Sequence, residues 1–174
     1  MPSDGAGTVR ALTQMRIVAV DDNANMRRLI KDILFAVGIR DLRLAEDGPS
    51  ALHMIETLVP DLILCDWHMA PMDGIAFLKC LRHRDNTASH HVPVIMLTAH
   101  TSPDIVRAAM EAGANHFVAK PLVPANLLKR MEWVRTDKRK FVLDGDRYVL
   151  PHKAMPTPAH TFEPEHGKDT WTLI

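Results

Sequence analysis

The sequence has few cysteines, no net charge and no long apolar run, and each absence excludes a class of protein. Its two cysteines, Cys65 and Cys80, lie in apolar runs, so neither a disulfide framework nor a Cys-x-x-Cys metal site is expected. The 21 basic and 21 acidic residues balance, which leaves no field that would attract nucleic acid or an anionic membrane. No stretch approaches the length of a membrane span, and residues 1–15 lack the apolar core of a signal peptide. We therefore expect a cytoplasmic protein that neither binds DNA directly nor enters a membrane.

What the sequence does contain is a regular alternation of short apolar runs and amphipathic segments. The 174 residues suffice for one well-cored domain and are too few for two of ordinary size. Apolar runs predict five strands, at 16–20, 42–45, 61–65, 93–97 and 116–119. Apolar residues at helical spacing, bounded by proline and glycine, predict five helices, at 25–37, 49–58, 75–81, 103–113 and 124–134. This order is typical of an α/β domain with a parallel sheet covered on both faces, here over residues 15–135.

The two ends of the chain depart from this alternation. Residues 1–14 are expected to form a flexible N-terminus, and after residue 135 the composition becomes basic and then proline-rich. Within the extension 136–174, Asp144-Gly145 lies between two β-prone runs and predicts a hairpin over 141–150. The remainder of the extension is expected to be irregular, and the basic run at 138–140 to be a solvated linker.

Polar residues that can carry chemistry follow four of the predicted strands. Asp21 and Asp22 follow the first strand and Asp66 the third, while Thr98 follows the fourth and Lys120 the fifth. Ligands of a doubly wound sheet bind at the carboxyl ends of its strands, where adjacent loops diverge. Three carboxylates, a hydroxyl and an ammonium are therefore expected to meet at one edge of the sheet.

This set of groups suits phosphoryl transfer. Carboxylates about 4 Å apart repel by roughly 4 kcal/mol per pair at an effective dielectric constant near 20, so the three acids favour a bound cation. Mg²⁺ prefers hard oxygen ligands and often uses one or two carboxylates together with a phosphoryl oxygen. Asp66 can then act as the nucleophile and form an acyl phosphate. Thr98 and Lys120 would hold the remaining phosphoryl oxygens.

Ordinary structural roles compete with this interpretation. Asp21 and Asp22 taken alone could cap the helix that begins near residue 25, and Lys120 could be a solvated lysine at a strand end. The histidines at 83, 90 and 91 fall in a polar loop without helical period, which favours surface positions over a metal site. The combination of residues at one edge decides in favour of a functional site.

Four segments of the chain resemble the receiver domain of response regulators. The resemblance covers about residues 16–134 and rests on VDDN at 20–23, DWHMAPMDG at 66–74, MLTAH at 96–100 and FVAKPL at 117–122. It implies a flavodoxin-like sheet of strand order 2-1-3-4-5. It also implies that Asp66 is phosphorylated and that Mg²⁺ or Mn²⁺ is bound by Asp21, Asp22, Asp66 and the backbone carbonyl of His68.

The same resemblance implies how the domain switches. A cis peptide bond is expected at Lys120-Pro121. Phosphoryl capture is expected to draw Thr98 inward, so that the ring of Phe117 fills the vacated space and the face formed by the fourth helix, fifth strand and fifth helix changes. His68 and His100 occupy variable positions that are expected to set the lifetime of the phosphoryl group.

The chain departs from the family pattern at two places. The proline that usually lies four residues after the acceptor aspartate is replaced by Ala70, and Pro71 follows, so we expect a different loop path there. The loop at 82–91 is longer than is typical and is expected to have little effect near the site.

The expected partners are a sensor histidine kinase or histidine phosphotransfer protein and a downstream protein. A homodimer is expected through the face of helix four, strand five and helix five, or through the C-terminal tail. No DNA-binding or catalytic output domain fits within 137–174, which indicates a stand-alone signalling domain rather than an enzyme.

A haloacid-dehalogenase-like phosphatase would need a second aspartate where His68 stands. A pseudo-receiver that only binds proteins would not need the complete set of five site residues.

Overall fold

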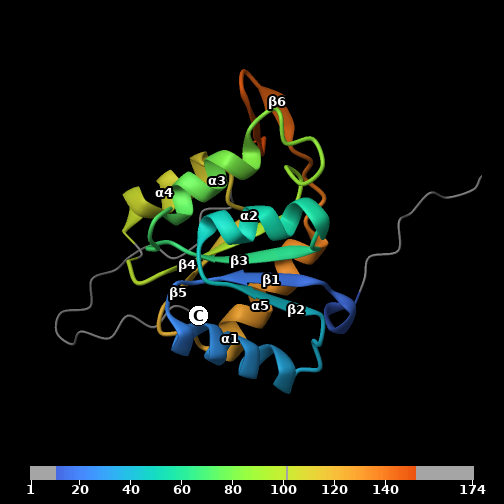
Figure 1. Cartoon of the computed structure of the whole chain (residues 1–174), viewed down its shortest axis with the longest axis vertical. Helices are drawn as coiled ribbons and strands as arrows, with labels where there is room; N and C mark the ends of the chain where they lie inside the picture. The colour runs from blue at the N-terminus through green and yellow to red at the C-terminus, as the bar shows by residue number, and fades with distance from the viewer. Residues whose placement is uncertain (1–10, 101, 152–174) are drawn as a thin grey trace, which may run out of the picture.

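A five-stranded parallel sheet forms the centre of the computed structural model, which describes residues 11–100 and 102–151 (Figure 1). Its strands are β1 (Ile17–Val20), β2 (Leu42–Ala45), β3 (Leu62–Asp66), β4 (Val94–Thr98) and β5 (His116–Ala119). Every neighbouring pair is parallel, and the order is β2-β1-β3-β4-β5. The predicted flavodoxin-like sheet is therefore confirmed.

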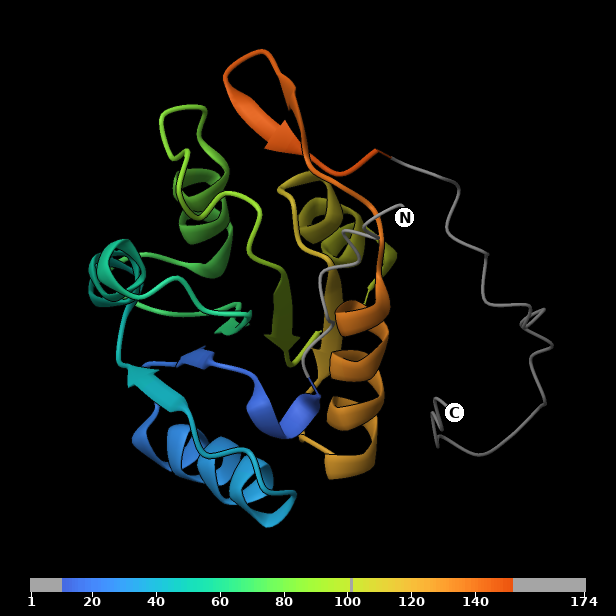
Figure 2. The same cartoon turned by 90° about the vertical axis from the view of Figure 1, so that its right-hand side faces the viewer.

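Helices cover both faces of this sheet (Figure 2). They are α1 (Ala24–Ala36), α2 (Gly48–Thr57), α3 (Gly74–Arg82), α4 (Pro103–Glu111) and α5 (Pro124–Thr136). Buried side chains of α2, α3 and α4 form one core cluster with the sheet, and those of α1 and α5 form a second cluster on the opposite face.

Side-chain alternation explains why the strands are apolar at every position. In β1, Val18 and Val20 enter the cluster of α2, α3 and α4, whereas Ile17 and Ala19 enter the cluster of α1 and α5. All four residues are buried because successive side chains of a strand point to opposite faces and both faces are covered.

The helix starts identify the capping residues. The Asn23 side chain accepts hydrogen bonds from the backbone N–H groups of Asn25 and Met26, so Asn23 caps α1. The alternative in which Asp21 or Asp22 caps this helix is therefore wrong, and both carboxylates remain for another role.

The helix bounds differ from the predicted ones by one or two residues at most ends. Among the described residues, no helix is long and apolar enough to cross a membrane.

A short helical turn precedes the first strand. Leu12–Gln14 form a 3-10 turn, and Leu12 packs against the core cluster of α1 and α5. The flexibility expected for residues 1–14 stays a prediction. Residues 1–10 lie outside the described residues.

The extension contains a hairpin of β6 (Val142–Asp144) and β7 (Arg147–Val149). Its turn consists of Gly145 and Asp146, so Asp144 ends a strand instead of entering the turn. Gly145 has φ +63°, and no non-glycine residue within 11–100 and 102–151 has positive φ. This combination matches a type II′ turn with glycine at its first central position. The rest of the predicted irregular tail, 152–174, lies outside the described residues.

This hairpin packs on the polar loop at 82–91. The Tyr148 ring stacks on His90 with centroids 3.5 Å apart, and the Arg84 N–H donates to the Asp146 carbonyl at 2.8 Å. Leu150, just after β7, is buried. This contact could not be predicted from the sequence, because neither segment has a period that identifies its contact face.

A buried arginine joins the two segments. Arg82, at the end of α3, donates hydrogen bonds to the backbone carbonyls of Gly113, His90 and Val92. It also donates to the side-chain oxygen of Asn115. Its guanidinium also lies over the Phe141 ring at 4.0 Å. Burial lowers the pKa of Arg82 to about 9. The residues just after α5 are thus part of the packed domain, not a separate appendage.

The basic run at 138–140 is only partly solvated. Arg139 forms a two-pronged ion pair with Asp137 and lies over the Trp133 ring at 5.2 Å. Lys138 and Lys140 are exposed, as expected for a linker.

Candidate functional site

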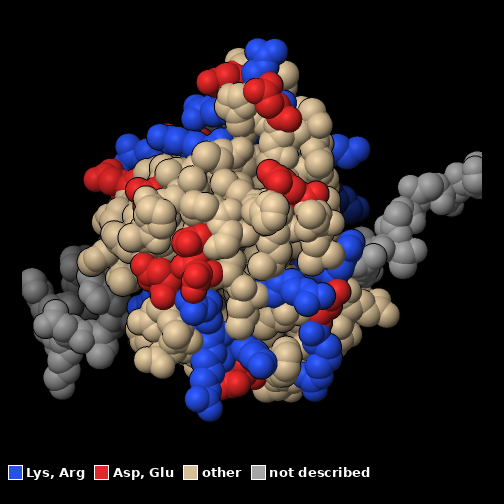
Figure 3. All heavy atoms as spheres, viewed as in Figure 1, with Lys and Arg blue, Asp and Glu red and all other residues tan. Residues whose placement is uncertain are grey.

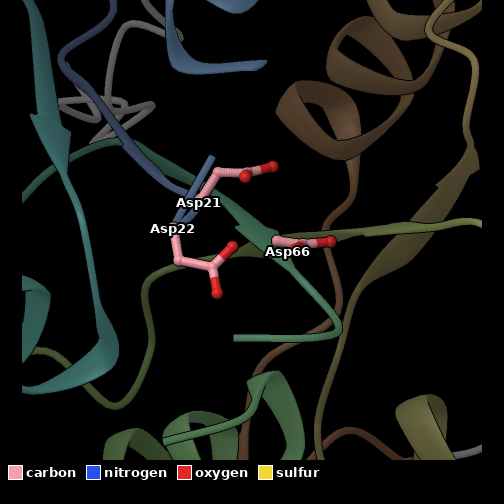
Figure 4. Close-up of side chains that lie close together, drawn as sticks. All are labelled: Asp21, Asp22 and Asp66. Carbon is pink, nitrogen blue, oxygen red and sulfur yellow. The ribbon is translucent and has the colours of Figure 1, made fainter. Parts of the chain in front are cut away.

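Three carboxylates from two separate segments meet at the carboxyl edge of the sheet (Figure 4). Asp21, Asp22 and Asp66 each offer one oxygen, and these oxygens lie within 4.8 Å of one another. Within 11–100 and 102–151, no other group of three or more acidic, histidine or cysteine side chains is placed in this way. The predicted convergence of the three acids is therefore present.

The ends of β1 and β3 position these acids. Asp66 is the last residue of β3, and Asp21 directly follows β1, which is the neighbour of β3 in the sheet. The Asp21 carbonyl accepts a hydrogen bond from the Arg27 side chain at 2.7 Å, which ties the end of the strand to α1. Asp21 is fully buried and Asp66 is 6% exposed, whereas Asp22 is open to solvent.

Lys120 bridges two of the carboxylates. Its Nζ lies 2.8 Å from Asp66 Oδ1 and 2.9 Å from Asp21 Oδ2. The Lys120-Pro121 peptide bond is cis, as expected. The Lys120 N–H donates to the Thr98 carbonyl at 2.7 Å, so the ends of β4 and β5 stay in register next to the site.

The protonation equilibria of this pair reflect burial and charge together. Burial raises the pKa of Asp66, the negative charge of Asp21 adds to the rise, and Lys120 opposes it. Burial alone would lower the pKa of Lys120, but hydrogen bonds to Asp66 and Asp21 outweigh it and leave that pKa raised. The ammonium therefore stays charged at neutral pH and offsets part of the repulsion among the acids.

Thr98 is at the site, but its hydroxyl is engaged elsewhere. The hydroxyl donates to the His100 carbonyl at 2.8 Å and accepts from the His100 N–H at 3.0 Å. Phe117 of β5 packs, partly buried, against the core cluster of α2, α3 and α4. The structure thus brings both residues to the expected elements, and their part in switching remains a prediction.

Two exposed histidines lie on the loops that follow β3 and β4. The rings of His68 and His100 meet edge to face with centroids 5.9 Å apart, although the residues come from the loops after β3 and β4. The sequence predicted a role for each, but not that the two would touch. The predicted metal contact of the His68 carbonyl remains a prediction.

The loop after Asp66 depends on a glycine that sequence reasoning left out. A Cβ at Gly74 would lie 2.5 Å from the Asp66 carbonyl oxygen and 2.4 Å from Met96 Cε, so only glycine permits this approach of α3 to β3. The Ala70-Pro71 bond is cis, and the Ala70 N–H donates to Asp22 Oδ2 at 3.3 Å. The Asp-Gly pair at 73–74 was the available signal, because Asp73 caps α3.

The donor set at this edge suits a hard divalent cation. Mg²⁺ and Mn²⁺ bind carboxylate oxygens and retain waters, and the cluster presents three carboxylates, one of which is open to solvent. Asp21, Asp22 and Asp66 are the residues that could hold such an ion.

Comparisons with known proteins agree with this geometry. Residues 17–132 match the model of the response regulator receiver domain. The chain is 35% identical over 118 residues to chemotaxis protein CheY-3 of Vibrio cholerae, covering 68% of this chain and 89% of that protein. It is 36% identical to chemotaxis protein CheY of Pseudomonas aeruginosa, covering 68% and 94%.

A solved structure supports the same assignment. The receiver domain of a sensor histidine kinase from Pseudomonas aeruginosa, which has a magnesium ion coordinated in its active site cleft, superposes with a TM-score of 0.64. The two are 28% identical over 71% of this chain and 98% of that domain. The described hairpin lies beyond the matched segment 17–132. From residue 17 to residue 132, this chain belongs to the response regulator receiver domain family.

Proposed function

We propose that this protein accepts a phosphoryl group on Asp66 from a phosphorylated histidine of a partner protein, in a reaction that requires Mg²⁺ or Mn²⁺. One observation carries the proposal: a nearly buried Asp66 carboxylate lies against the ammonium of Lys120 and beside two further carboxylates. A nucleophile, a fixed cation and a set of metal ligands are thus within reach of one phosphoryl group.

The proposed step is an in-line displacement at phosphorus. A carboxylate oxygen of Asp66 attacks, the phosphorus–nitrogen bond to the donor imidazole breaks, and the imidazole leaves with the electron pair and takes up a proton. Lys120, already 2.8 Å from Asp66 Oδ1, would stabilise the negative charge of the transferred group. A bound divalent ion would supply further positive charge to the phosphoryl oxygens. Asp21, Asp22, Asp66 and the His68 carbonyl are the proposed ligands.

Thr98 connects this step to the proposed switch. To reach a phosphoryl oxygen, its hydroxyl must give up the two hydrogen bonds to His100. We propose that this movement lets the partly buried Phe117 ring shift inward and changes the surface of α4, β5 and α5. That surface would contact a downstream protein or a second copy of the chain.

The proposed biological setting is two-component signalling of the chemotaxis type in the cytoplasm. The donor would be a sensor histidine kinase or a histidine phosphotransfer protein. The relatives named above are themselves chemotaxis proteins, which supports this setting. Phosphoryl lifetime would be set in part by His68 and His100.

A phosphotransfer assay tests the proposal. The wild type is incubated with a small acyl phosphate or phosphoramidate donor and Mg²⁺, and incorporation is followed by intact mass. Asp66→Asn should abolish incorporation, chelation of Mg²⁺ should suppress it, and hydroxylamine should release the group as expected for an acyl phosphate. Asp104→Asn is the matched control, because Asp104 is an exposed aspartate of α4 paired with Arg107.

The same assay separates the competing functions. Unchanged incorporation in Asp66→Asn, or no incorporation in the wild type, would refute the proposal, and the latter result would favour a pseudo-receiver. Multiple turnovers of a phosphate monoester would favour a phosphatase. The absence of an acid two residues after Asp66, where exposed His68 lies, argues against that chemistry.

A further inference from the structure

The outer edge of β6 is unpaired in the part of the chain that the structure describes. β6 pairs with β7 on one side, and the other side of β7 is bridged to His83. All three residues of β6 are exposed, including Val142 at 47% and Leu143 at 53%. Both views show that the hairpin projects beyond the helices (Figures 1 and 2). An exposed apolar edge strand is a template for the addition of another strand.

The hairpin is held rigidly enough to act as such a template. Tyr148 stacks on His90, Phe141 lies over the buried Arg82 guanidinium, and Leu150 is buried. These contacts fix the edge to α3 and to the loop at 82–91. A strand that is already ordered loses little conformational entropy when it pairs.

The register of the hairpin determines which backbone groups face outward. A pair that flanks a two-residue turn is hydrogen-bonded, and bonded and non-bonded pairs then alternate. Asp144 and Arg147 flank the turn, so Leu143 and Tyr148 form a non-bonded pair. The N–H and C=O of Leu143 therefore point away from β7, and by the same alternation those of Phe141 do too.

These outward groups and the charges beside them match a second copy of the same strand. In an antiparallel pair with Val142 opposite its own copy, Phe141 of each strand faces Leu143 of the other, and both pairs can exchange hydrogen bonds. The same register places exposed Lys140 of each copy opposite exposed Asp144 of the other. Basic and acidic side chains lie together on the projecting end of the molecule (Figure 3). Opposite charges directly across antiparallel strands are stabilising.

We propose that two copies of this chain associate through antiparallel pairing of their β6 strands, with Val142 at the two-fold axis. The interface is small, so the dimer is weak and depends on protein concentration. It is distinct from the α4, β5 and α5 surface, and it does not depend on phosphoryl transfer at Asp66. Its failure would leave the proposed phosphoacceptor function untouched.

A proline substitution tests the backbone part of this proposal. Sedimentation velocity of the full chain is measured over a concentration series that reaches the millimolar range. Leu143→Pro removes an N–H that points away from β7, so the hairpin should persist while dimerisation is lost. The ring-current shifts of the His90 protons against Tyr148, followed by NMR, confirm that the hairpin is retained. Leu143→Ala, which keeps the N–H, is the matched control and should retain the dimer.

A charge exchange tests the register. Asp144→Lys alone and Lys140→Asp alone each replace two attractive pairs with two repulsive ones and should weaken the dimer by about tenfold or more. The double variant should restore it. Asp146→Lys, in the turn, makes the same charge change outside the paired segment and should have a smaller effect.

Three results would overturn the proposal. The first is a wild type that remains monomeric to millimolar concentration. The second is a dimer that Leu143→Pro leaves intact, and the third is a double charge variant no better than the single ones. If the first result is found together with binding of an unrelated strand at this edge, the partner is another protein and not a second copy of the chain.

Discussion

A buried histidine gives the sharpest prediction about the stability of this domain. His116, the first residue of β5, is 7% exposed, and its ring meets the Trp133 ring edge to face at 5.1 Å. Burial, followed by the positive charge of Arg130 and with a smaller contribution from Arg139, lowers the pKa of His116 to about 4. The folded protein therefore holds a neutral imidazole at neutral pH.

The size of the effect follows from the two pKa values. An unfolded chain protonates this histidine near pH 6.5, whereas the folded chain does so only near pH 4. Between these values the unfolded state binds one more proton, so the free energy of unfolding falls by about 1.4 kcal/mol for each unit by which pH falls. This contribution, about 3 kcal/mol in all, is fully present above pH 6.5 and is lost as pH approaches 4.

Urea unfolding of His116→Phe, followed by tryptophan fluorescence, measures this contribution. Phenylalanine keeps a ring against Trp133 but cannot be protonated. It also removes the acceptor of the Phe117 N–H, a cost that does not depend on pH. Between about pH 4.5 and 6.5 the wild type should lose stability more steeply than the variant, by about 1.4 kcal/mol per pH unit.

The control is a histidine that the fold leaves in solvent. The His53 side chain on α2 is 84% exposed, so His53→Phe should leave the slope of the wild type unchanged. Equal slopes for the wild type and His116→Phe would refute the argument, because burial would then not oppose the charge on His116.

Three further predictions concern the site and the hairpin. Gly74→Ala forces a backbone carbonyl of β3 to move, so it should lower the free energy of unfolding by about 2 kcal/mol and slow phosphorylation. Gly48→Ala meets only a flexible methionine side chain and should lower the free energy of unfolding by less. Equal losses for the two variants in urea unfolding would contradict this. Arg82→Met leaves buried carbonyl groups without donors and should lower the free energy of unfolding by about 3 kcal/mol or more, and a loss below about 1 kcal/mol would show that these bonds matter little. Replacing either His68 or His100 by alanine should change the rate of dephosphorylation and spare phosphoryl acceptance; unchanged decay in both variants would refute their assigned role.

The sheet and the acidic edge could be predicted because their signals are local. Apolar runs followed by Asp66, Thr98 and Lys120 indicate, within a few residues, that a strand is present, that it is buried and where it ends. The same locality explains why β2 and β5 were predicted with their observed bounds, at 42–45 and 116–119.

The parts that could not be predicted depend on contacts between distant segments. The acceptors of Arg82 are spread from His90 to Asn115, and nothing near Arg82 marks it as buried. The Thr98 hydroxyl is at the expected strand end, yet its bonds to His100 depend on the path of the loop that follows. Asn23, one residue beyond the acidic pair, proved to be the helix cap, and only the backbone geometry distinguishes the three candidates.

The route of the chain after α5 has a consequence for any attempt to define the smallest working unit. The segment leaves α5 on one side of the sheet and reaches α3 on the other, where Phe141 closes over Arg82. The segment therefore contacts elements on both faces of the sheet. A shortened chain cut at the end of α5 would retain every acidic ligand and Lys120. It would, however, expose the buried guanidinium of Arg82 to water. The segment that matches the receiver family ends at residue 132, whereas the packed domain extends at least to Phe141.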